Sequence, residues 1–154
     1  VFVLLFFGFA AVCGTYYVQA GQLSPAAMLS SLPVGLLAMA ILTVNNLRDI
    51  ATDRASGKHT LAVRLGESGA VIEYGVWVGL AYLVTVLGVM AGILPALALL
   101  SLLSVPRAIG LIQQVARTRG RALNALLAKT GQLELLFALL FSAGLLISRW
   151  WSGF

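Results

Sequence analysis

The chain has 154 residues, of which 60% are hydrophobic and only 10% carry a charged side chain. Soluble globular proteins carry about 25% charged residues, and a chain of this length cannot bury so much apolar surface away from water. The composition therefore excludes a water-soluble domain and indicates an integral membrane protein.

The net charge of +5 does not indicate a nucleic-acid partner, because the basic residues lie mainly in two short segments between apolar runs. A nucleic-acid surface would need a basic stripe interleaved with exposed aromatic side chains.

Cys13 is the only cysteine, which excludes an internal disulfide and a thiolate zinc site. The sequence starts at Val1 inside an apolar run without a signal-peptide pattern, so we expect it to begin part-way through a longer protein.

Five apolar stretches are long enough to cross a bilayer, whose hydrocarbon core of about 30 Å requires about 20 helical residues. They cover approximately residues 1–19, 26–44, 74–91, 93–112 and 131–147, and the third and fourth are separated by Gly92 and Pro95. In lipid, backbone hydrogen bonds are satisfied only by helices or closed barrels. Runs such as residues 96–100 are apolar on every side, unlike a barrel strand. The expected fold is all-α, a polytopic transmembrane bundle of five helices.

Two basic segments, residues 45–68 and 113–129, lie between the apolar spans. Their basic residues are Arg48, Arg54, Lys58, Arg64, Arg117, Arg119, Arg121 and Lys129. Because cytoplasmic loops are enriched in Lys and Arg, we expect both segments on the cytoplasmic side of a bacterial inner membrane, with Arg149 as the single exception. The residues expected to form an aromatic belt at the outer interface are Tyr16, Tyr17, Trp150 and Trp151.

The most informative polar pattern lies just after the second span. Asn45, Asp49 and Asp53 are spaced four residues apart, so a helix would place them on one face, with about 6 Å of rise between the two aspartates. We expect the second helix to continue as far as Gly57, where glycine permits a break. Carboxylates at this spacing repel each other, and the chain holds only five acidic residues. Mg²⁺ is a natural counter-ion, because it binds one or two carboxylates together with water and phosphate oxygens.

The spacing alone leaves other interpretations open. A solvated charged face at the end of a helix would show the same pattern. A transporter could use the carboxylate pair to bind a translocated cation, although transporters place such groups near the midplane and within repeats. The carboxylate pair by itself therefore does not distinguish among these functions.

The residues around the two aspartates match a longer motif of a known protein family. Residues 45–49 (Asn-Asn-Leu-Arg-Asp), 52–54 (Thr-Asp-Arg) and 57–66 (Gly-Lys-His-Thr-Leu-Ala-Val-Arg-Leu-Gly) resemble the second aspartate-rich motif of the UbiA superfamily of intramembrane prenyltransferases. The paired Asn and the ending of residues 57–66 look like the branch that prenylates 1,4-dihydroxy-2-naphthoate in menaquinone biosynthesis. Residues 14–17 and 135–146 are also similar to that branch, so the resemblance covers nearly the whole chain.

The resemblance implies a fold of nine transmembrane helices around a central cavity, with two aspartate-rich motifs facing each other on the cytoplasmic side. Residues 1–154 would form the C-terminal part of this single domain, with helices that correspond to helices five to nine. The N-terminal half, with the first aspartate-rich motif, would lie outside the chain. Apolar side chains would line a path for the isoprenoid tail, and Gly35, Gly79 and Gly88 would permit close helix approach.

The resemblance also implies an activity: Mg²⁺-dependent transfer of a polyprenyl group from prenyl diphosphate to 1,4-dihydroxy-2-naphthoate, with loss of CO₂, to give demethylmenaquinone. Asp49 and Asp53 would be the catalytic residues and the metal ligands. The residues expected to bind diphosphate are Asn45, Arg48, Lys58 and Arg64. Arg48 could instead pair with a neighbouring aspartate or a phospholipid, and another aromatic quinone precursor remains open as the acceptor. No protein partner is predicted.

Three further ionisable residues lie in or near the spans. Glu73 and Glu134 lie near the expected cytoplasmic ends of helices, which favours an interfacial position for both. Arg107 lies within the fourth span, where an ionisable residue is either a functional candidate or a side chain that extends to the interface.

Overall fold

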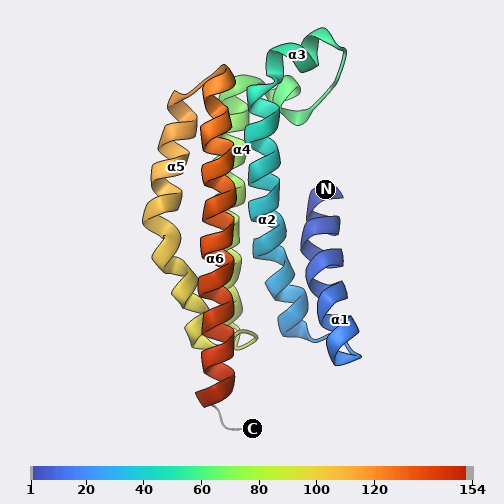
Figure 1. Ribbon diagram of the computed structural model, residues 1–154, viewed down its shortest axis with the longest axis vertical. Helices are drawn as coiled ribbons and strands as arrows, with labels where there is room; N and C mark the ends of the chain where they lie inside the picture. Colours follow the sequence, from blue (N-terminus) through green and yellow to red (C-terminus); the bar gives the residue numbers. More distant parts are fainter. Residues whose placement is uncertain (1, 152–154) are drawn as a thin grey trace.

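The computed structural model describes residues 2–151, which form helices and connections without a strand. This confirms the all-α fold class, and Figure 1 shows the long helices aligned side by side. In chain order the elements are η1 (Leu4–Cys13, a π-helix), α1 (Gly14–Ala20), α2 (Pro25–Arg48), α3 (Ile50–Ala55), α4 (Leu61–Met90), η2 (Ala96–Ser104, a 3₁₀-helix), α5 (Val105–Arg117), η3 (Gly120–Ala122, a 3₁₀-helix) and α6 (Leu123–Trp151).

Four of the five expected spans are helices long and apolar enough to cross a membrane. They are Pro25–Arg48, Leu61–Met90, Ala96–Arg117 and Gly120–Trp151. The first expected span corresponds to a shorter apolar helix, Leu4–Ala20. The predicted break between the third and fourth spans is confirmed, because α4 ends at Met90 and Gly92 adopts a left-handed φ of 69° before Pro95. The protein is therefore an integral membrane protein with a polytopic helix bundle.

Both basic segments lie at one end of the bundle. Figure 1 shows α3, the start of α4 and the connection between α5 and α6 at this end, which we call the basic end. The connections between α1 and α2 and between α4 and η2 lie at the opposite end. The helices therefore place the two basic segments on one side of a membrane, as the charge pattern predicts.

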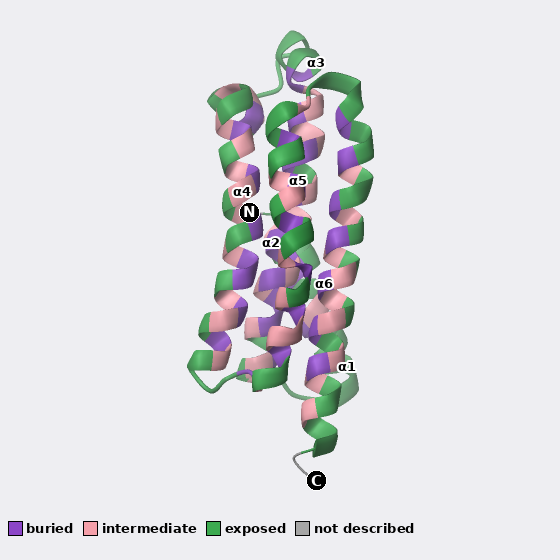
Figure 2. Cartoon of the chain, turned by 90° about the vertical axis from the view of Figure 1, so that its left-hand side faces the viewer, coloured by how far each residue is buried: buried purple, intermediate pink, exposed green. Residues whose placement is uncertain are grey.

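Helix α2 is the central element, because it packs against η1, α4 and α6. It begins with an N-cap at Ser24, whose side chain accepts a hydrogen bond of 3.1 Å from the Ala27 backbone N–H, followed by Pro25 at the first helical position. Figure 2 shows the buried residues running along the faces where the helices meet. Within lipid the hydrophobic effect does not drive helices together, so this close packing stabilises the bundle instead.

Hydroxyl groups in the core are hydrogen-bonded across helices. The Tyr74 hydroxyl of α4 lies 3.1 Å from Thr130 Oγ1 of α6, and the Tyr82 hydroxyl lies 2.7 Å from Ser104 Oγ. The ring of Tyr82 also contacts Phe137 edge-to-face, with centroids 5.4 Å apart. Polar side chains in lipid are stabilised by such partners, so these contacts hold α4 against η2 and α6.

Two of the three glycines expected at close helix contacts lie at such contacts. A Cβ on Gly35 would lie 2.9 Å from Gly8 Cα, and one on Gly88 would lie 2.6 Å from the Leu29 side chain. The expectation is wrong for Gly79, where a Cβ would meet nothing within 4 Å among the described residues. Gly144 was not expected, yet a Cβ there would lie 2.0 Å from the Leu97 carbonyl oxygen. Helix α6 therefore approaches η2 at Gly144.

Candidate functional site

The aspartate segment forms two helices rather than one. Helix α2 ends at Arg48 and α3 begins at Ile50, because Asp49 between them has φ −98° and ψ 8°. The expectation of a continuous helix is therefore wrong at Asp49, a residue type whose side chain competes with helical hydrogen bonding. The Asp49 N–H still donates to the Asn45 carbonyl at 3.2 Å, and the Asp53 N–H donates to the Asp49 carbonyl at 2.8 Å. The turn after α3 contains Gly57 with φ 73°, as predicted for a break.

Arg48 is the centre of the polar cluster at the end of α2. Its Nε donates to Asp49 Oδ1 at 2.7 Å and its Nη2 donates to Asp49 Oδ2 at 2.5 Å. Nη2 also donates to Asn45 Oδ1 at 2.9 Å, and Nη1 donates to Asn124 Oδ1 of α6 at 2.8 Å. The planar guanidinium suits this bidentate geometry. Arg48 was expected to bind diphosphate or to pair with a neighbouring aspartate or a phospholipid, and in the structure it pairs with Asp49.

This pairing affects the protonation of Asp49, which lies outside the spanning helix. The hydrogen bonds from Arg48 lower the pKa of the Asp49 carboxyl below its ordinary value, and the charges of Arg48 and Lys58 lower it further against the opposing effect of desolvation. Asp49 is therefore an ionised carboxylate at neutral pH, as a ligand for a hard cation must be.

Asp53 has its own basic partner. Its side chain is only 9% exposed, and Lys58 Nζ lies 3.1 Å from Asp53 Oδ1. The chain folds back to allow this contact, because the Lys58 N–H donates to the Asp53 carbonyl at 2.9 Å. Each carboxylate is thus balanced by one cationic side chain, which offsets the repulsion expected between the two aspartates.

The donor set is suited to a hard cation but is small. Asp49, Asp53 and the Asn45 amide supply oxygen ligands of the kind that Mg²⁺ prefers. Within residues 2–151, no group of three or more His, Cys, Asp or Glu side chains could hold a metal ion. A cation here would need further oxygen atoms, from water or from a substrate phosphate, and would compete with Arg48 and Lys58 for the carboxylates.

A polar pocket of about 500 Å³ lies beside this cluster. Its charged and polar lining comes from Arg48, Asp49, Thr52, Arg121 and Asn124, so η3 and the first turn of α6 contribute to it beside the aspartate segment. Two guanidinium groups in one pocket favour an anionic ligand such as a phosphate. No sequence pattern pointed to Asn124, and Arg121 contributed only to the expected membrane orientation.

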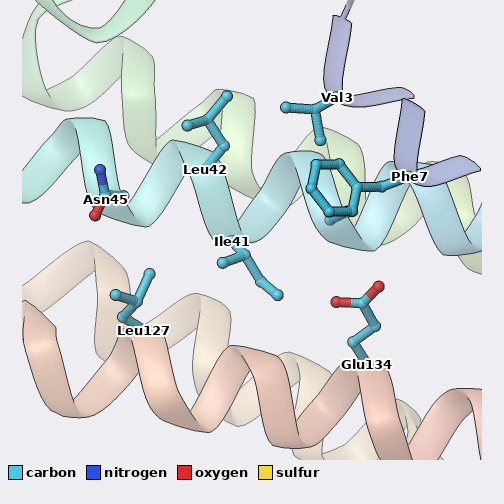
Figure 3. A pocket seen from close by; sticks show the side chains of 8 residues that line it. Val3, Phe7, Ile41, Leu42, Asn45, Leu127 and Glu134 are labelled. Carbon is cyan, nitrogen blue, oxygen red and sulfur yellow. The ribbon is translucent and has the colours of Figure 1, made fainter. Parts of the chain in front are cut away.

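A second pocket, of about 370 Å³, lies between η1, α2 and α6. Figure 3 shows its mainly apolar side chains, with Asn45 and Glu134 as the polar groups. The complete lining is Val3, Phe7, Ala38, Ile41, Leu42, Asn45, Leu127 and Glu134. Because Asn45 lines this apolar pocket and accepts a hydrogen bond from Arg48, the apolar pocket adjoins the charged cluster.

Glu134 lies deeper in the bundle than the sequence suggested. Helix α6 begins at Leu123, so Glu134 is about 16 Å along its axis from that end. Its carboxyl group points into the apolar pocket toward Ile41 and Phe7 (Figure 3). Within residues 2–151, Glu134 has neither a hydrogen-bond partner nor an ion-pair partner. The expectation that Glu134 lies near the end of its helix is therefore wrong, whereas its interfacial position stays a prediction.

The remaining predicted site residue, Arg64, does not join the cluster. It is exposed in the first turn of α4, which ends at Gly66, a residue with φ 73° and ψ 179°. Glu67, just beyond, pairs with Arg119 of the connection between α5 and α6, with Arg119 Nε 2.7 Å from Glu67 Oε2. The described residues thus bring together Asn45, Arg48 and Asp49, and separately Asp53 and Lys58.

The sequence profile of the UbiA prenyltransferase family matches residues 1–115 of the chain. The 1,4-dihydroxy-2-naphthoate octaprenyltransferase of Escherichia coli (strain K12) is 38% identical over 149 residues, which are 96% of this chain and 48% of that protein. The protein of the same name from Haemophilus influenzae is 37% identical over 146 residues, 94% of this chain and 47% of the relative. The human UbiA prenyltransferase domain-containing protein 1 is 34% identical over 146 residues, 95% of this chain and 42% of the relative.

The chain therefore spans about half the length of the curated relatives that it matches. No solved structure matches it significantly. The family profile covers η1, α2 and the aspartate segment, whereas the residues of η3 and α6 that line the two pockets lie beyond it. The chain belongs to the UbiA prenyltransferase family.

Proposed function

We propose that the complete product of this gene transfers a polyprenyl group from prenyl diphosphate to 1,4-dihydroxy-2-naphthoate, with loss of CO₂. The product would be demethylmenaquinone, the precursor of menaquinone. Support comes from the UbiA family membership and from two relatives named as 1,4-dihydroxy-2-naphthoate octaprenyltransferases. The single structural observation that carries the proposal is the contact between Arg48 and Asn45, which joins the charged cluster to the apolar pocket.

The charged cluster would hold the diphosphate. Asp49 and Asp53 would bind Mg²⁺, which when bound would act as a Lewis acid and stabilise negative charge on the leaving diphosphate. Lys58 and Arg48 would then release the carboxylates and bind phosphate oxygens instead. Arg64 would approach the diphosphate from the first turn of α4, and Asn45 would orient it.

The apolar pocket would hold apolar parts of the substrates. Its volume of about 370 Å³ is in the range of pockets for small organic ligands, with mostly hydrophobic walls and few polar groups. Glu134 would supply a polar contact to the aromatic acceptor, because a carboxyl group without a partner is costly in a membrane helix unless it serves a ligand.

We also propose that the basic end faces the cytoplasm of a bacterium, as its positive charges favour. A diphosphate group is charged and stays at the water interface, so a charged site at the end of the bundle would be accessible to it. A transport function is less well supported, since Asp49 and Asp53 lie at the end of a spanning helix rather than near its middle.

The test is prenyl transfer in membranes that carry the complete gene product, with dihydroxynaphthoate and 4-hydroxybenzoate as competing acceptors. We expect the naphthoate to be prenylated and the benzoate to remain unchanged. Preference for the benzoate would mean that the proposed acceptor is wrong and that another quinone precursor is the substrate. Transfer to neither acceptor, with protein present in the membrane, would contradict the proposed function.

A further inference from the structure

A groove of about 310 Å³ runs between α5 and α6, away from both pockets described above. It is lined by Arg107, Gly110, Leu111, Gln114 and Lys129. Two basic side chains thus lie in one groove between membrane-spanning helices, and neither belongs to the aspartate segment.

Both basic side chains contact neutral amides. Arg107 Nη2 donates to Gln132 Oε1 at 2.6 Å, and Lys129 Nζ donates to Gln114 Oε1 at 3.2 Å. Amide oxygens accept these hydrogen bonds but carry no net charge. The hydrogen bonds therefore orient the two cations without neutralising them.

The five acidic residues of the chain do not supply counter-ions for this groove. Among residues 2–151, the ion pairs join Asp49 to Arg48, Asp53 to Lys58 and Glu67 to Arg119. Glu73 accepts a hydrogen bond from Trp77, and Glu134 lines the apolar pocket. The two positive charges in the groove are therefore available for an anion from outside the described chain.

The groove lies on the opposite side of α6 from the apolar pocket. Successive residues of an α-helix are rotated by about 100°. Lys129 is two positions after Leu127, and Gln132 is two positions before Glu134, so each is rotated by about 200° from a residue that lines the pocket. On the same side of α6, Leu139 lies two turns beyond Gln132 and is 60% exposed. This face is suited to lipid.

The two charges also lie toward the basic end. Helices α5 and α6 are antiparallel, and Gln114 of α5 lies beside Lys129 of α6. Arg107 is seven residues before Gln114, so its backbone lies at the level of Leu136, which is seven residues after Lys129. The Arg107 guanidinium instead reaches Gln132, one turn nearer the basic end, or about 6 Å. Long basic side chains extend from within a membrane to its interface in this way.

We propose that this groove binds the headgroup of an anionic phospholipid from the leaflet at the basic end. Arg107 and Lys129 contact its phosphate oxygens, and the amides of Gln114 and Gln132 hydrogen-bond to its ester or hydroxyl oxygens. Basic pockets between transmembrane helices have the charge and position that such headgroups require. The proposal concerns a face away from the catalytic pockets and does not depend on the reaction assigned to them.

The test is native mass spectrometry of the complete gene product in mild detergent, with phosphatidylglycerol or phosphatidylcholine added. We expect the wild-type protein to bind phosphatidylglycerol more tightly than phosphatidylcholine. In the variant Arg107→Gln/Lys129→Gln, the affinity for phosphatidylglycerol should fall about fivefold for each charge removed. Phosphatidylcholine binding should stay unchanged. Arg117→Gln is the matched control, because Arg117 is exposed at the end of the same helix α5.

A second variant distinguishes the loss of charge from misfolding as the cause of weaker lipid binding. Arg107→Lys/Lys129→Arg keeps both charges and should keep the lipid preference. Equal binding of the two lipids by the wild type, or a preference retained without the two charges, would overturn the proposal. Displacement of phosphatidylglycerol by an equal concentration of inorganic phosphate would also overturn it, because the site would then bind a soluble anion.

Discussion

Asn124 accepts a hydrogen bond of 2.8 Å from Arg48 Nη1, although 76 residues separate them in the chain. The contact joins the first turn of α6 to the end of α2. Since Arg48 holds both carboxylate oxygens of Asp49, Asn124 fixes that carboxylate indirectly. Asn124 is therefore a positioning residue for the charged cluster.

Asn124→Ala should lower the kcat/KM of the complete gene product for prenyl diphosphate by about tenfold, the effect of one hydrogen bond to a charged group. The loss should appear in the KM for prenyl diphosphate, with the KM for the aromatic acceptor unchanged. Steady-state kinetics with each substrate varied in turn measure both. Asn124→Gln keeps an uncharged amide oxygen that can accept from Arg48 and should retain most activity; equal loss in both variants would mean that the hydrogen bond is unimportant.

Gly66→Ala should destabilise the segment that follows the aspartates. Gly66 has φ 73° and ψ 179°, a region that only glycine occupies without strain of about 1–3 kcal/mol. A Cβ there would contact nothing within 4 Å, so the strain arises from the backbone alone. We expect faster proteolysis after α3 and a lower Tm in detergent.

Gly79→Ala is the matched control on the same helix. A Cβ on Gly79 also meets nothing within 4 Å, and its backbone is helical. Alanine should therefore preserve or raise stability, by up to about 1 kcal/mol. Similar proteolysis and Tm values for the two variants would contradict the strain assigned to Gly66.

Glu134→Leu should raise the Tm of the complete gene product by a few degrees and lower its turnover. Removing an unpartnered carboxyl from an apolar pocket relieves a desolvation cost, and about 1 kcal/mol shifts Tm by several degrees in a small domain. Glu134→Gln keeps hydrogen bonding and should retain more turnover than the leucine variant. Ser142→Leu, at an exposed position of α6, is the control and should leave turnover unchanged. A Glu134→Leu protein with full turnover would exclude a role in acceptor binding.

Hydropathy and charge were sufficient to predict the all-α bundle, the break near Gly92 and the location of both basic segments at one end. These features follow from local composition and from the length of each apolar run. The pairing of Asp53 with Lys58 is also local, because only five residues separate them, but it was not predicted, since Lys58 was expected to bind diphosphate. The interruption at Asp49 was missed, since helix propensity distinguishes poorly between a bend and a continuous helix.

Contacts between distant segments could not be predicted. Asn124 reaches Arg48 only because α6 packs against α2. The orientation of Glu134 likewise depends on which face of α6 meets α2 and η1, and hydropathy is similar around much of that helix. Single-sequence patterns specify which segments are helical, whereas the partners of their polar residues depend on packing.

Asp49 and Asp53 are proposed to bind a divalent cation together with the leaving diphosphate. The most direct measurement is prenyl transfer by membranes with the complete gene product, after chelation with EDTA and again after addition of Mg²⁺. We predict that chelation abolishes turnover, that Mg²⁺ restores it, and that Asp49→Asn and Asp53→Asn each remove the response to Mg²⁺. Undiminished turnover in EDTA, or a normal Mg²⁺ response in both variants, would contradict the claim.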